Sequence, residues 1–520
     1  MFVTAFFYIE KESDRMEYLV TKEQMKQIED RAMNQIKIPS ILLMEQAAMG
    51  ILEEMEKEEQ IQNKIFILCG MGNNGADGLA LARLLHQKGY LSVMIGIVGE
   101  EEKGTKEWQI QYEMIKNLKI EYVIGTDWIE DMNFSNYDCI VDGLFGIGLS
   151  RELKGNYFEI VHKINKVGNK VYAIDIPSGI CSNTGKILGI GIKAYKTITF
   201  EYKKIGCMLY PGAEYSGNIV VKHIGIPTYI SNNFPFSYYT YSLSKTIHTL
   251  LPKRASYSNK GTFGKVVVFA GSKNMAGAAY LSGRAAYEMG AGLVQIVTCD
   301  SNREIIQTLL PEAILTTYDP EDISWEEISH AIDWADVIVI GPGLSVKNYA
   351  KQLLQFVLNN SKVPIVIDAD GLNILAENSS LIKKCNSQII FTPHLKEFSR
   401  LVKKDLEEMK KDLFTSIQSF LDNSNHILVC KDARTIVGRN GTPFYINQSG
   451  NHGMATGGSG DVLTGMIAGL IAQGLSSEDG AVVGVYLHGL AGNSACKEKG
   501  AYSMKATDIL NHISKITNVC

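Results

Sequence analysis

The chain has 520 residues, of which 45% are hydrophobic and 21% charged, and its formal net charge at pH 7 is −5. This length allows two or three domains with sizeable cores, and the charge argues against a nucleic-acid or anionic-membrane partner. The nine cysteines are scattered singly, without a C-x-x-C pair. This distribution argues against a disulfide framework or a zinc knuckle and suits a reducing compartment, so we expect a cytoplasmic protein.

No stretch of the sequence approaches the length of about 20 apolar residues that a transmembrane helix needs. The first 16 residues contain a short apolar run, but acids and Arg15 follow it in place of a small-residue cleavage site. We therefore expect neither a membrane span nor a signal peptide.

The first half begins with two predicted helices and a strand. Thr21-Lys-Glu-Gln24 is a capping box that predicts the start of the first helix, and a second helix is predicted from about Pro39. An apolar strand over residues 65–69 then leads into a glycine turn, and we expect the next helix to begin at about Leu79.

Three predicted strands of the first half, over residues 65–69, 137–142 and 171–175, end in polar residues and glycines. Because the carboxyl ends of parallel strands meet at one edge of a sheet, we expect one binding site there. The first glycine loop matches G-x-G-x-x-G, but it lacks the acid that a redox dinucleotide site carries about 20 residues later. Amides and carboxylates on such turns can hold a monovalent cation and sugar hydroxyls. The groups concerned are Asn73, Asn74, Asp77, Asp142, Asp175 and Ser178.

The regular pattern dissolves over residues 224–258, where Pro, Ser, Asn and Tyr are mixed without a long period. We predict a linker here and a domain boundary near residue 240, which gives domains 1–240 and 241–520. An alternative interpretation of residues 238–241 is a short edge strand.

The second half alternates predicted strands with helical patterns, which is typical of an α/β sandwich with a mostly parallel sheet. No G-x-x-x-x-G-K-[ST] segment occurs, so the sequence excludes a P-loop enzyme. The predicted strands cover residues 264–269, 292–298, 336–340, 364–368, 389–391 and 426–431.

One glycine-rich stretch carries the chemistry of the second half: Gly453-Met-Ala-Thr-Gly-Gly-Ser-Gly-Asp461-Val-Leu-Thr-Gly465. Glycines let backbone N–H groups converge on an anion, and a helix that starts at about Asp461 aims its positive end at the same point. A carboxylate there would repel a phosphate, but it can take a proton from a hydroxyl about to meet a phosphoryl group. We therefore predict that Asp461 is a catalytic base. The alternative is a glycine-rich turn in which Asp461 is an ordinary N-cap.

This stretch resembles the ADP/ATP-dependent NAD(P)H-hydrate dehydratases, together with GPGL at 341–344, DADGLN at 368–373 and TPHLKE at 392–397. The resemblance covers about residues 243–515 and implies a ribokinase-like α/β domain, with Mg²⁺ and with ADP or ATP as co-substrate. It implies substrate contacts at Ala278, Gly343, His394 and Asp461. It implies nucleotide contacts at Lys431, Asp432, Ala433, Arg434, Thr435 and Gly460.

The motifs NNGADG at 73–78, VDGLFGIG at 141–148 and IDIPSG at 174–179 resemble the NAD(P)H-hydrate epimerases over about Leu19 to His223. This resemblance implies a Rossmann-like three-layer domain, with a potassium ion held by Asn74, Asp142 and Ser178. We further hypothesise that Asp175 acts catalytically by orienting the hydrated ring. The implied substrate contacts are Asn73, Asn74, Gly75, Ala76, Asp77, Gly146, Ile147, Gly148, Leu149, Ser150, Arg151, Glu152 and Asp175.

Together the two resemblances imply a bifunctional enzyme that repairs hydrated NADH and NADPH. The first half would convert the R epimer at C6 into the S epimer, and the second half would dehydrate the S epimer at the expense of ADP or ATP. Two alternatives remain open: the second half could be a small-molecule kinase, and the first a non-catalytic binding module. As partners we expect NAD(P)H hydrates and an adenine nucleotide, no nucleic acid or membrane, and a homo-oligomer.

Overall fold

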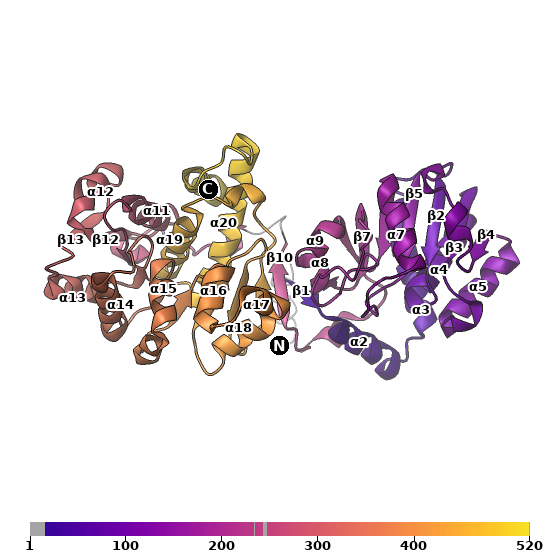
Figure 1. Ribbon diagram of the computed structural model, residues 1–520, viewed down its shortest axis with the longest axis horizontal. Helices are drawn as coiled ribbons and strands as arrows, with labels where there is room; N and C mark the ends of the chain where they lie inside the picture. The colour runs from indigo at the N-terminus through magenta and orange to yellow at the C-terminus, as the bar shows by residue number, and fades with distance from the viewer. Residues whose placement is uncertain (1–15, 233, 243–246, 519–520) are drawn as a thin grey trace. The chain divides into compact units, whose positions relative to one another are not determined.

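A computed structural model describes residues 16–232, 234–242 and 247–518 of the chain (Figure 1). The chain forms two compact units. One is Tyr18–Tyr238, and the other is Tyr239–Cys520 with Met16 and Glu17. Among the described residues, no helix is both long and apolar enough to cross a membrane.

The first unit is built on a sheet with the strand order β4-β3-β2-β5-β6-β7-β9, in which every neighbouring pair is parallel. Two residues of a further strand, Leu19 and Val20 of β1, pair in parallel with β8. The strands are β1 (Met16–Val20), β2 (Lys64–Cys69), β3 (Ser92–Ile97), β4 (Glu121–Ile124), β5 (Cys139–Gly143), β6 (Lys170–Ile174), β7 (Lys196–Phe200), β8 (Lys203–Lys204) and β9 (Asn218–Lys222).

Helices cover both faces of this sheet, as the two sides of strand β2 show. Ile65, Ile67 and Cys69 pack into a core with α3, α4 and α5, whereas Phe66 and Leu68 pack into a second core with α7 (Figure 1). This alternation follows from the period of two in a strand, and it confirms the predicted three-layer arrangement. The helices are α2 (Lys22–Asp30), α3 (Ser40–Met55), α4 (Asn73–Gln87), α5 (Lys106–Leu118), α6 (Trp128–Asp131), α7 (Asn156–Val167), α8 (Ile205–Met208) and α9 (Gly212–Tyr215).

The start of α4 differs from the sequence prediction. We expected a glycine turn and a helix from about Leu79, but the helix begins at Asn73, directly after the extended Gly72. The preceding loop packs closely against the start of this helix, which only a glycine at position 75 permits: a Cβ on Gly75 would lie 1.9 Å from the carbonyl oxygen of Gly70. The segment 73–77 therefore occupies the first turns of a helix, where free N–H groups point outward.

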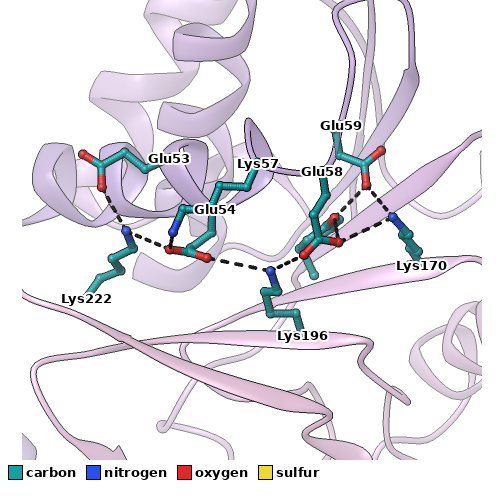
Figure 2. Close-up of polar contacts among 9 residues, drawn as sticks. Glu53, Glu54, Lys57, Glu58, Glu59, Lys170, Lys196 and Lys222 are labelled. Atoms are coloured by element: carbon teal, nitrogen blue, oxygen red, sulfur yellow. Dashed lines mark hydrogen bonds and ion pairs between the residues drawn. The ribbon is translucent and has the colours of Figure 1, made fainter.

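An ion-pair network fastens the end of α3 to the strands of the first unit (Figure 2). Lys222 lies 3.0 Å from Glu54, and the buried Lys196 contacts Glu58 and lies 3.7 Å from Glu54. Further contacts join Lys222 to Glu53, Lys57 to Glu54, and Lys170 to Glu58 and Glu59. The network crosses β6, β7 and β9 and connects elements that are distant in sequence.

The second unit has the strand order β13-β12-β11-β14-β15-β16-β17-β18-β19-β10. The strands from β13 to β17 are parallel, and β18 and β19 continue the sheet as antiparallel strands. This confirms the predicted α/β class with a mostly parallel sheet. The strands are β10 (Tyr238–Tyr241), β11 (Lys265–Phe269), β12 (Leu293–Cys299), β13 (Ile314–Tyr318), β14 (Val337–Ile340), β15 (Ile365–Ile367), β16 (Ile389–Phe391), β17 (Ile427–Cys430), β18 (Ile436–Arg439) and β19 (Phe444–Ile446).

The helix α19 (Ser459–Ala472) lies in the core of the second unit, with residues 462–471 buried on every side. Its glycines let it approach α11 (Ala276–Glu288) closely: a Cβ on Gly465 would lie 2.1 Å from the carbonyl oxygen of Ser282. The remaining helices are α10 (Ile247–Leu250), α12 (Arg303–Leu309), α13 (Trp325–Trp334), α14 (Asn348–Asn360), α15 (Asp370–Glu377), α16 (Leu395–Val402), α17 (Leu406–Lys411), α18 (Leu413–Leu421), α20 (Ser477–Lys499) and α21 (Ala506–Thr517).

The predicted linker over residues 224–258 is more ordered than we expected. It contains the strand β10, which corresponds to the alternative interpretation of residues 238–241. Tyr239 and Tyr241 are buried, and their rings lie 5.4 and 5.2 Å from the ring of Tyr445 on β19. Burial of these aromatic rings therefore stabilises a strand in a segment whose sequence shows no regular hydrophobic pattern.

Candidate functional site

In the first unit, Asp142 and Ser178 lie together at the carboxyl ends of β5 and β6. The Ser178 hydroxyl donates to Asp142 Oδ1 (2.6 Å), and the Ser178 N–H donates to Oδ2 (2.8 Å). Burial raises the pKa of Asp142 to about 6, against the effect of these hydrogen bonds. No lysine, arginine or histidine among the described residues forms an ion pair with this buried carboxylate, so the site suits a cation.

Asn74 reaches the same place from the first turn of α4. A Cβ on Gly146 would lie 3.2 Å from its side-chain oxygen, so the loop after β5 packs directly on this amide. The side-chain nitrogen of Asn74 is buried and has no hydrogen-bond partner among the described residues. The side-chain oxygen of Asn74 lies against the loop at Gly146, near a carboxylate and a hydroxyl, and oxygen ligands of this kind fit a hard monovalent cation.

The segment 146–152 forms the outer wall of this region. The ammonium group of Lys22 on α2 donates to the carbonyl of Gly148 (3.1 Å), and Asn183 accepts from the Lys22 N–H (2.8 Å). Ser150, Arg151 and Glu152 are exposed, as is Asn73, whereas Gly75 and Ala76 are buried under the loop.

Asp175 follows β6 with a left-handed backbone (φ 65°), so its side chain turns toward β7. Its Oδ1 atom accepts from the Thr199 hydroxyl (3.0 Å), from the Phe200 N–H (3.1 Å) and from the ammonium group of Lys204. Lys204 is 1% exposed and also donates to Thr199 Oγ1 (3.1 Å) and the Phe200 carbonyl (3.0 Å). No motif in the sequence singles out this lysine.

Two further carboxyl groups lie in the field of Asp175. Burial raises the pKa of Glu29 on α2 to about 7, with Lys204 opposing and Asp175 adding to the rise. Burial likewise raises the pKa of Asp77 on α4 well above its ordinary range, and the charges of Asp175 and Glu29 add to it. Glu29 was not among the predicted site residues, because a single acid on an amphipathic helix resembles any solvent-exposed residue.

In the second unit, Ala278 and Gly343 are neighbours. Gly343 has a left-handed backbone (φ 59°), and a Cβ on it would lie 2.9 Å from the Cβ of Ala278 at the start of α11. The turn is fixed from the other side, because the Ser345 N–H donates to the carboxylate of Asp370 (2.7 Å). The two predicted substrate contacts thus form one small-residue surface.

Asp368 links the elements around the glycine-rich stretch. It is 1% exposed, and its carboxylate accepts from the ammonium group of Lys431 (2.7 Å) and from the hydroxyl of Thr464 on α19 (3.0 Å). Burial raises its pKa, but Lys431 and the hydroxyls of Thr392 and Thr464 together bring it below the ordinary value. A Cβ on Gly460 would lie 3.1 Å from Lys431 Nζ, so Lys431 lies directly beside the glycine-rich turn.

Asp461 lies in the first turn of α19, after Gly458, which has a left-handed backbone (φ 90°). Burial raises the pKa of Asp461 to about 7, Asp368 raises it further, and Lys431 opposes them. A carboxyl group with this pKa is partly ionised at neutral pH and can accept a proton, which is what a general base requires.

His394 lies next to Lys431, since their residues form a parallel bridge. It caps α16: its Nδ1 accepts from the Glu397 N–H (3.1 Å), while the Glu397 carboxylate accepts from the His394 N–H (2.9 Å). Burial and Lys431 lower the pKa of His394, so the ring is neutral at pH 7. With Nδ1 accepting, the ring proton is on Nε2, where it can be donated to a ligand.

The predicted nucleotide segment 431–435 is the turn between β17 and β18. Asp432 and Ala433 are exposed on it. Arg434 donates to the carbonyl of Gln448 (2.9 Å), and Thr435 donates to the carbonyl of Asp432 (3.2 Å). The exposed turn thus extends from Lys431 and Gly460 along the surface of the unit.

The sequence matches two family models, one for each half. Residues 40–206 match the model described as YjeF-related protein N-terminus, and residues 266–515 match NAD(P)H-hydrate dehydratase. A bifunctional NAD(P)H-hydrate repair enzyme from Moorella thermoacetica is 34% identical over 512 residues, which cover 95% of this chain and 96% of that protein. The chain belongs to the bifunctional NAD(P)H-hydrate repair enzymes.

Other members of this repair-enzyme family are similarly close. The protein of this name from Coxiella burnetii is 36% identical over 88% of this chain and 90% of its own length. Among solved structures, the ADP/ATP-dependent NAD(P)H-hydrate dehydratase from Bacillus subtilis, co-crystallised with ATP and Mg²⁺, is 29% identical, with a TM-score of 0.47. That match covers 52% of this chain and 94% of that protein.

Proposed function

We propose that this repair enzyme restores hydrated NADH and NADPH, with an epimerase in residues 1–240 and an ADP- or ATP-dependent dehydratase in residues 241–520. The observation that carries the proposal is the position of Asp461. This carboxyl group has a pKa of about 7 and begins a buried helix in a half that matches the dehydratase model.

In the dehydratase half, Asp461 takes the proton from the C6 hydroxyl of the S epimer. The hydroxyl oxygen then attacks the terminal phosphoryl group of ADP or ATP, and AMP or ADP leaves. The C6–O bond breaks next, phosphate departs and the proton at C5 is lost, so the ring double bond returns. Ala278, Gly343 and the Nε2–H of His394 are proposed to hold the hydrated ring during these steps.

The nucleotide is proposed to lie along Lys431 to Thr435, with its phosphates at the N-terminus of α19. The N–H groups of residues 457–460 and the ammonium group of Lys431 stabilise the charge that develops on the transferred group. Mg²⁺, when bound, neutralises phosphate charge.

In the epimerase half, Asn74, Asp142 and Ser178 are proposed to hold K⁺. The buried carboxylate of Asp142, which has no cationic partner among the described residues, and the side-chain oxygen of Asn74 beside the Gly146 loop support this assignment. A cation there fixes the loops after β5 and β6, and K⁺ supplies only this electrostatic fixation. The hydrated dinucleotide is proposed to lie along residues 73–77 and 146–152, with Asp175 at its hydrated ring.

Product analysis separates the repair reaction from a small-molecule kinase. We would incubate the enzyme with Mg²⁺, ADP and the separated S epimer of hydrated NADH, and follow the products by phosphorus NMR and chromatography. Equal amounts of NADH, AMP and inorganic phosphate are expected. A stable phosphorylated dinucleotide that accumulates without NADH would support the kinase alternative and contradict the proposed dehydratase.

A further inference from the structure

The buried lysine Lys204 has no role in the reaction proposed above, although it contacts the carboxylate of Asp175. Its three ammonium donors are all used: they reach Asp175 Oδ1, Thr199 Oγ1 and the carbonyl oxygen of Phe200. A buried ammonium group is costly unless it is paired, so its partner must carry a negative charge. Lys204 therefore forms a buried ion pair with Asp175.

The same contacts fix the orientation of the Asp175 carboxylate. Oδ1 accepts from Lys204, Thr199 and the Phe200 N–H, which fills its acceptor capacity. Oδ2 has no hydrogen-bond partner among the described residues, and the Asp175 side chain keeps 12% of its surface exposed. One oxygen is thus clamped, and the other remains for a ligand.

The charged and titratable groups around Asp175 come from three other elements. Glu29 lies on α2, Asp77 on α4, and Cys207 and Lys204 at the β8–α8 corner; burial raises the pKa values of Glu29, Asp77 and Cys207. Glu29 and Asp77 have no hydrogen-bond or salt-bridge partner within the described part of the chain. Of these three carboxyl groups, only Asp175 has a lysine partner within the described part of the chain.

We propose that Lys204 is a positioning residue of the epimerase: its ion pair orients Asp175 as the base, with Oδ2 presented to the C6 hydroxyl. The proposal rests on the epimerase activity proposed above.

Epimerisation of a C6 hydroxyl beside a ring nitrogen needs no oxidant. Asp175 takes the hydroxyl proton as the C6–N1 bond breaks, a protonated carboxyl group supplies a proton to the nitrogen, and an aldehyde forms. Rotation and ring closure on the other face return both protons.

The first unit offers a matched control for this lysine. Lys196 is also buried, at 5% exposure, and it pairs with Glu58 and Glu54 at the opposite end of β7 (Figure 2). Loss of either lysine leaves a carboxylate without its partner, so both substitutions should lower stability. Only the loss of Lys204 should change the rate of epimerisation and its pH dependence.

The test follows epimerisation of the separated R epimer of hydrated NADH by the full chain, without ADP, using chromatography and subtracting the spontaneous rate. For Lys204→Met we expect kcat to fall about 100-fold with little change in KM, and the acidic limb of the pH profile to move to higher pH. Lys204→Arg should restore part of kcat, because it keeps the charge. Lys196→Met should lower the melting temperature and leave kcat and the pH profile unchanged.

Each outcome has a distinct meaning. A folded Lys204→Met enzyme with wild-type kcat and pH profile would overturn the positioning role and leave the epimerase assignment intact. An equal loss of kcat in Lys196→Met and Lys204→Met would also overturn it, because the loss would then follow stability. A wild-type enzyme that dehydrates the S epimer but does not convert the R epimer would contradict both the proposed epimerase and this inference.

Discussion

Each half of the chain pairs a buried aspartate at the end of a strand with a lysine from a neighbouring element. Asp175 pairs with Lys204, and Asp368 pairs with Lys431 at 2.7 Å. Such pairs contribute little net stability, because desolvation offsets their attraction. They do fix where charge is located, which is the property that a site for proton or phosphoryl transfer needs.

The proposed base of the dehydratase gives a direct pH prediction. With the pKa of Asp461 at about 7, the fraction of ionised base rises through neutral pH, so kcat/KM for the S epimer should rise between about pH 6 and 8. Asp461→Asn should lower kcat about 10²- to 10⁴-fold and still bind ADP. Unchanged turnover in Asp461→Asn, or a profile that is flat from pH 5 to 8, would exclude this role.

The charge of Asp368 should influence the pKa of the proposed base, Asp461. This charge raises the pKa of Asp461, and in Asp368→Asn the freed Lys431 would lower that pKa as well. We therefore expect the midpoint of the pH profile to move to lower pH, by about one unit. Asp432→Asn, which removes an exposed carboxylate from the nucleotide turn, is the control and should leave the midpoint in place. A midpoint that moves to higher pH in Asp368→Asn would contradict the account.

At the scale of elements, the backbone turn at the start of α19 requires glycine at position 458 but not at position 457. Gly458 has a φ of 90°, and a Cβ there would lie 2.5 Å from the side chain of Leu281. Gly457 has open space around its Cβ position. The sequence alone does not distinguish these adjacent glycines.

Gly458→Ala should therefore lower the stability of the second unit by about 1–2 kcal/mol and displace the helix start, with loss of dehydratase activity. Gly457→Ala should leave stability within about 0.5 kcal/mol of the wild type. Thermal unfolding of both full-length variants measures the difference. Equal melting temperatures would show that the turn is not strained at Gly458.

The ion-pair network at the end of α3 makes a second prediction at this scale. The hydrogen bond to Lys196, together with Tyr195 and Lys170, lowers the pKa of Glu58 to about 2. The network therefore adds stability above the ordinary pKa of a glutamate and loses it as the pH falls toward 2. Glu58→Gln should lower the opening free energy of α3 by about 1–2 kcal/mol at pH 7, and by less at pH 3. Hydrogen exchange of the α3 amides measures it. Glu53→Gln, at a largely exposed site, should change little; an equal effect would contradict the prediction.

The sequence was sufficient for most strands but not for all of them. The period-two and apolar patterns predicted the central strands, such as residues 65–69 and 389–391, because these are buried on both faces. The pattern gave no separate prediction for the antiparallel strands β18 and β19, which are short and follow the nucleotide turn directly. Likewise, motif spacing indicated Asp461 and Asp142. Lys204 and Glu29 belong to no motif, and only the folded structure places them near Asp175.

At the scale of the whole molecule, each unit has its own sheet and its own core. We therefore expect the two activities to survive separation of the halves. The boundary should matter, because β10 belongs to the core of the second unit: Tyr239 and Tyr241 cover Tyr445, and the Tyr486 hydroxyl donates to the Ser242 carbonyl (2.9 Å).

A fragment of residues 239–520 should retain dehydratase activity and a single thermal transition. A fragment of residues 247–520 exposes the Tyr445 face and should melt at least several degrees lower, since burial of aromatic rings is lost. Differential scanning calorimetry of the two fragments makes the comparison. Identical melting temperatures would show that β10 does not stabilise this unit.

The measurement that tests the central claim most directly is recovery of the near-ultraviolet absorbance of the reduced nicotinamide ring. The full chain, ADP, Mg²⁺ and K⁺ are added to a mixture of both epimers of hydrated NADH. The account predicts complete recovery at a rate well above spontaneous epimerisation, with AMP and phosphate formed in equal amounts. Recovery that stops when the S epimer is used up would contradict the epimerase. No recovery with either ADP or ATP would contradict the repair function as a whole.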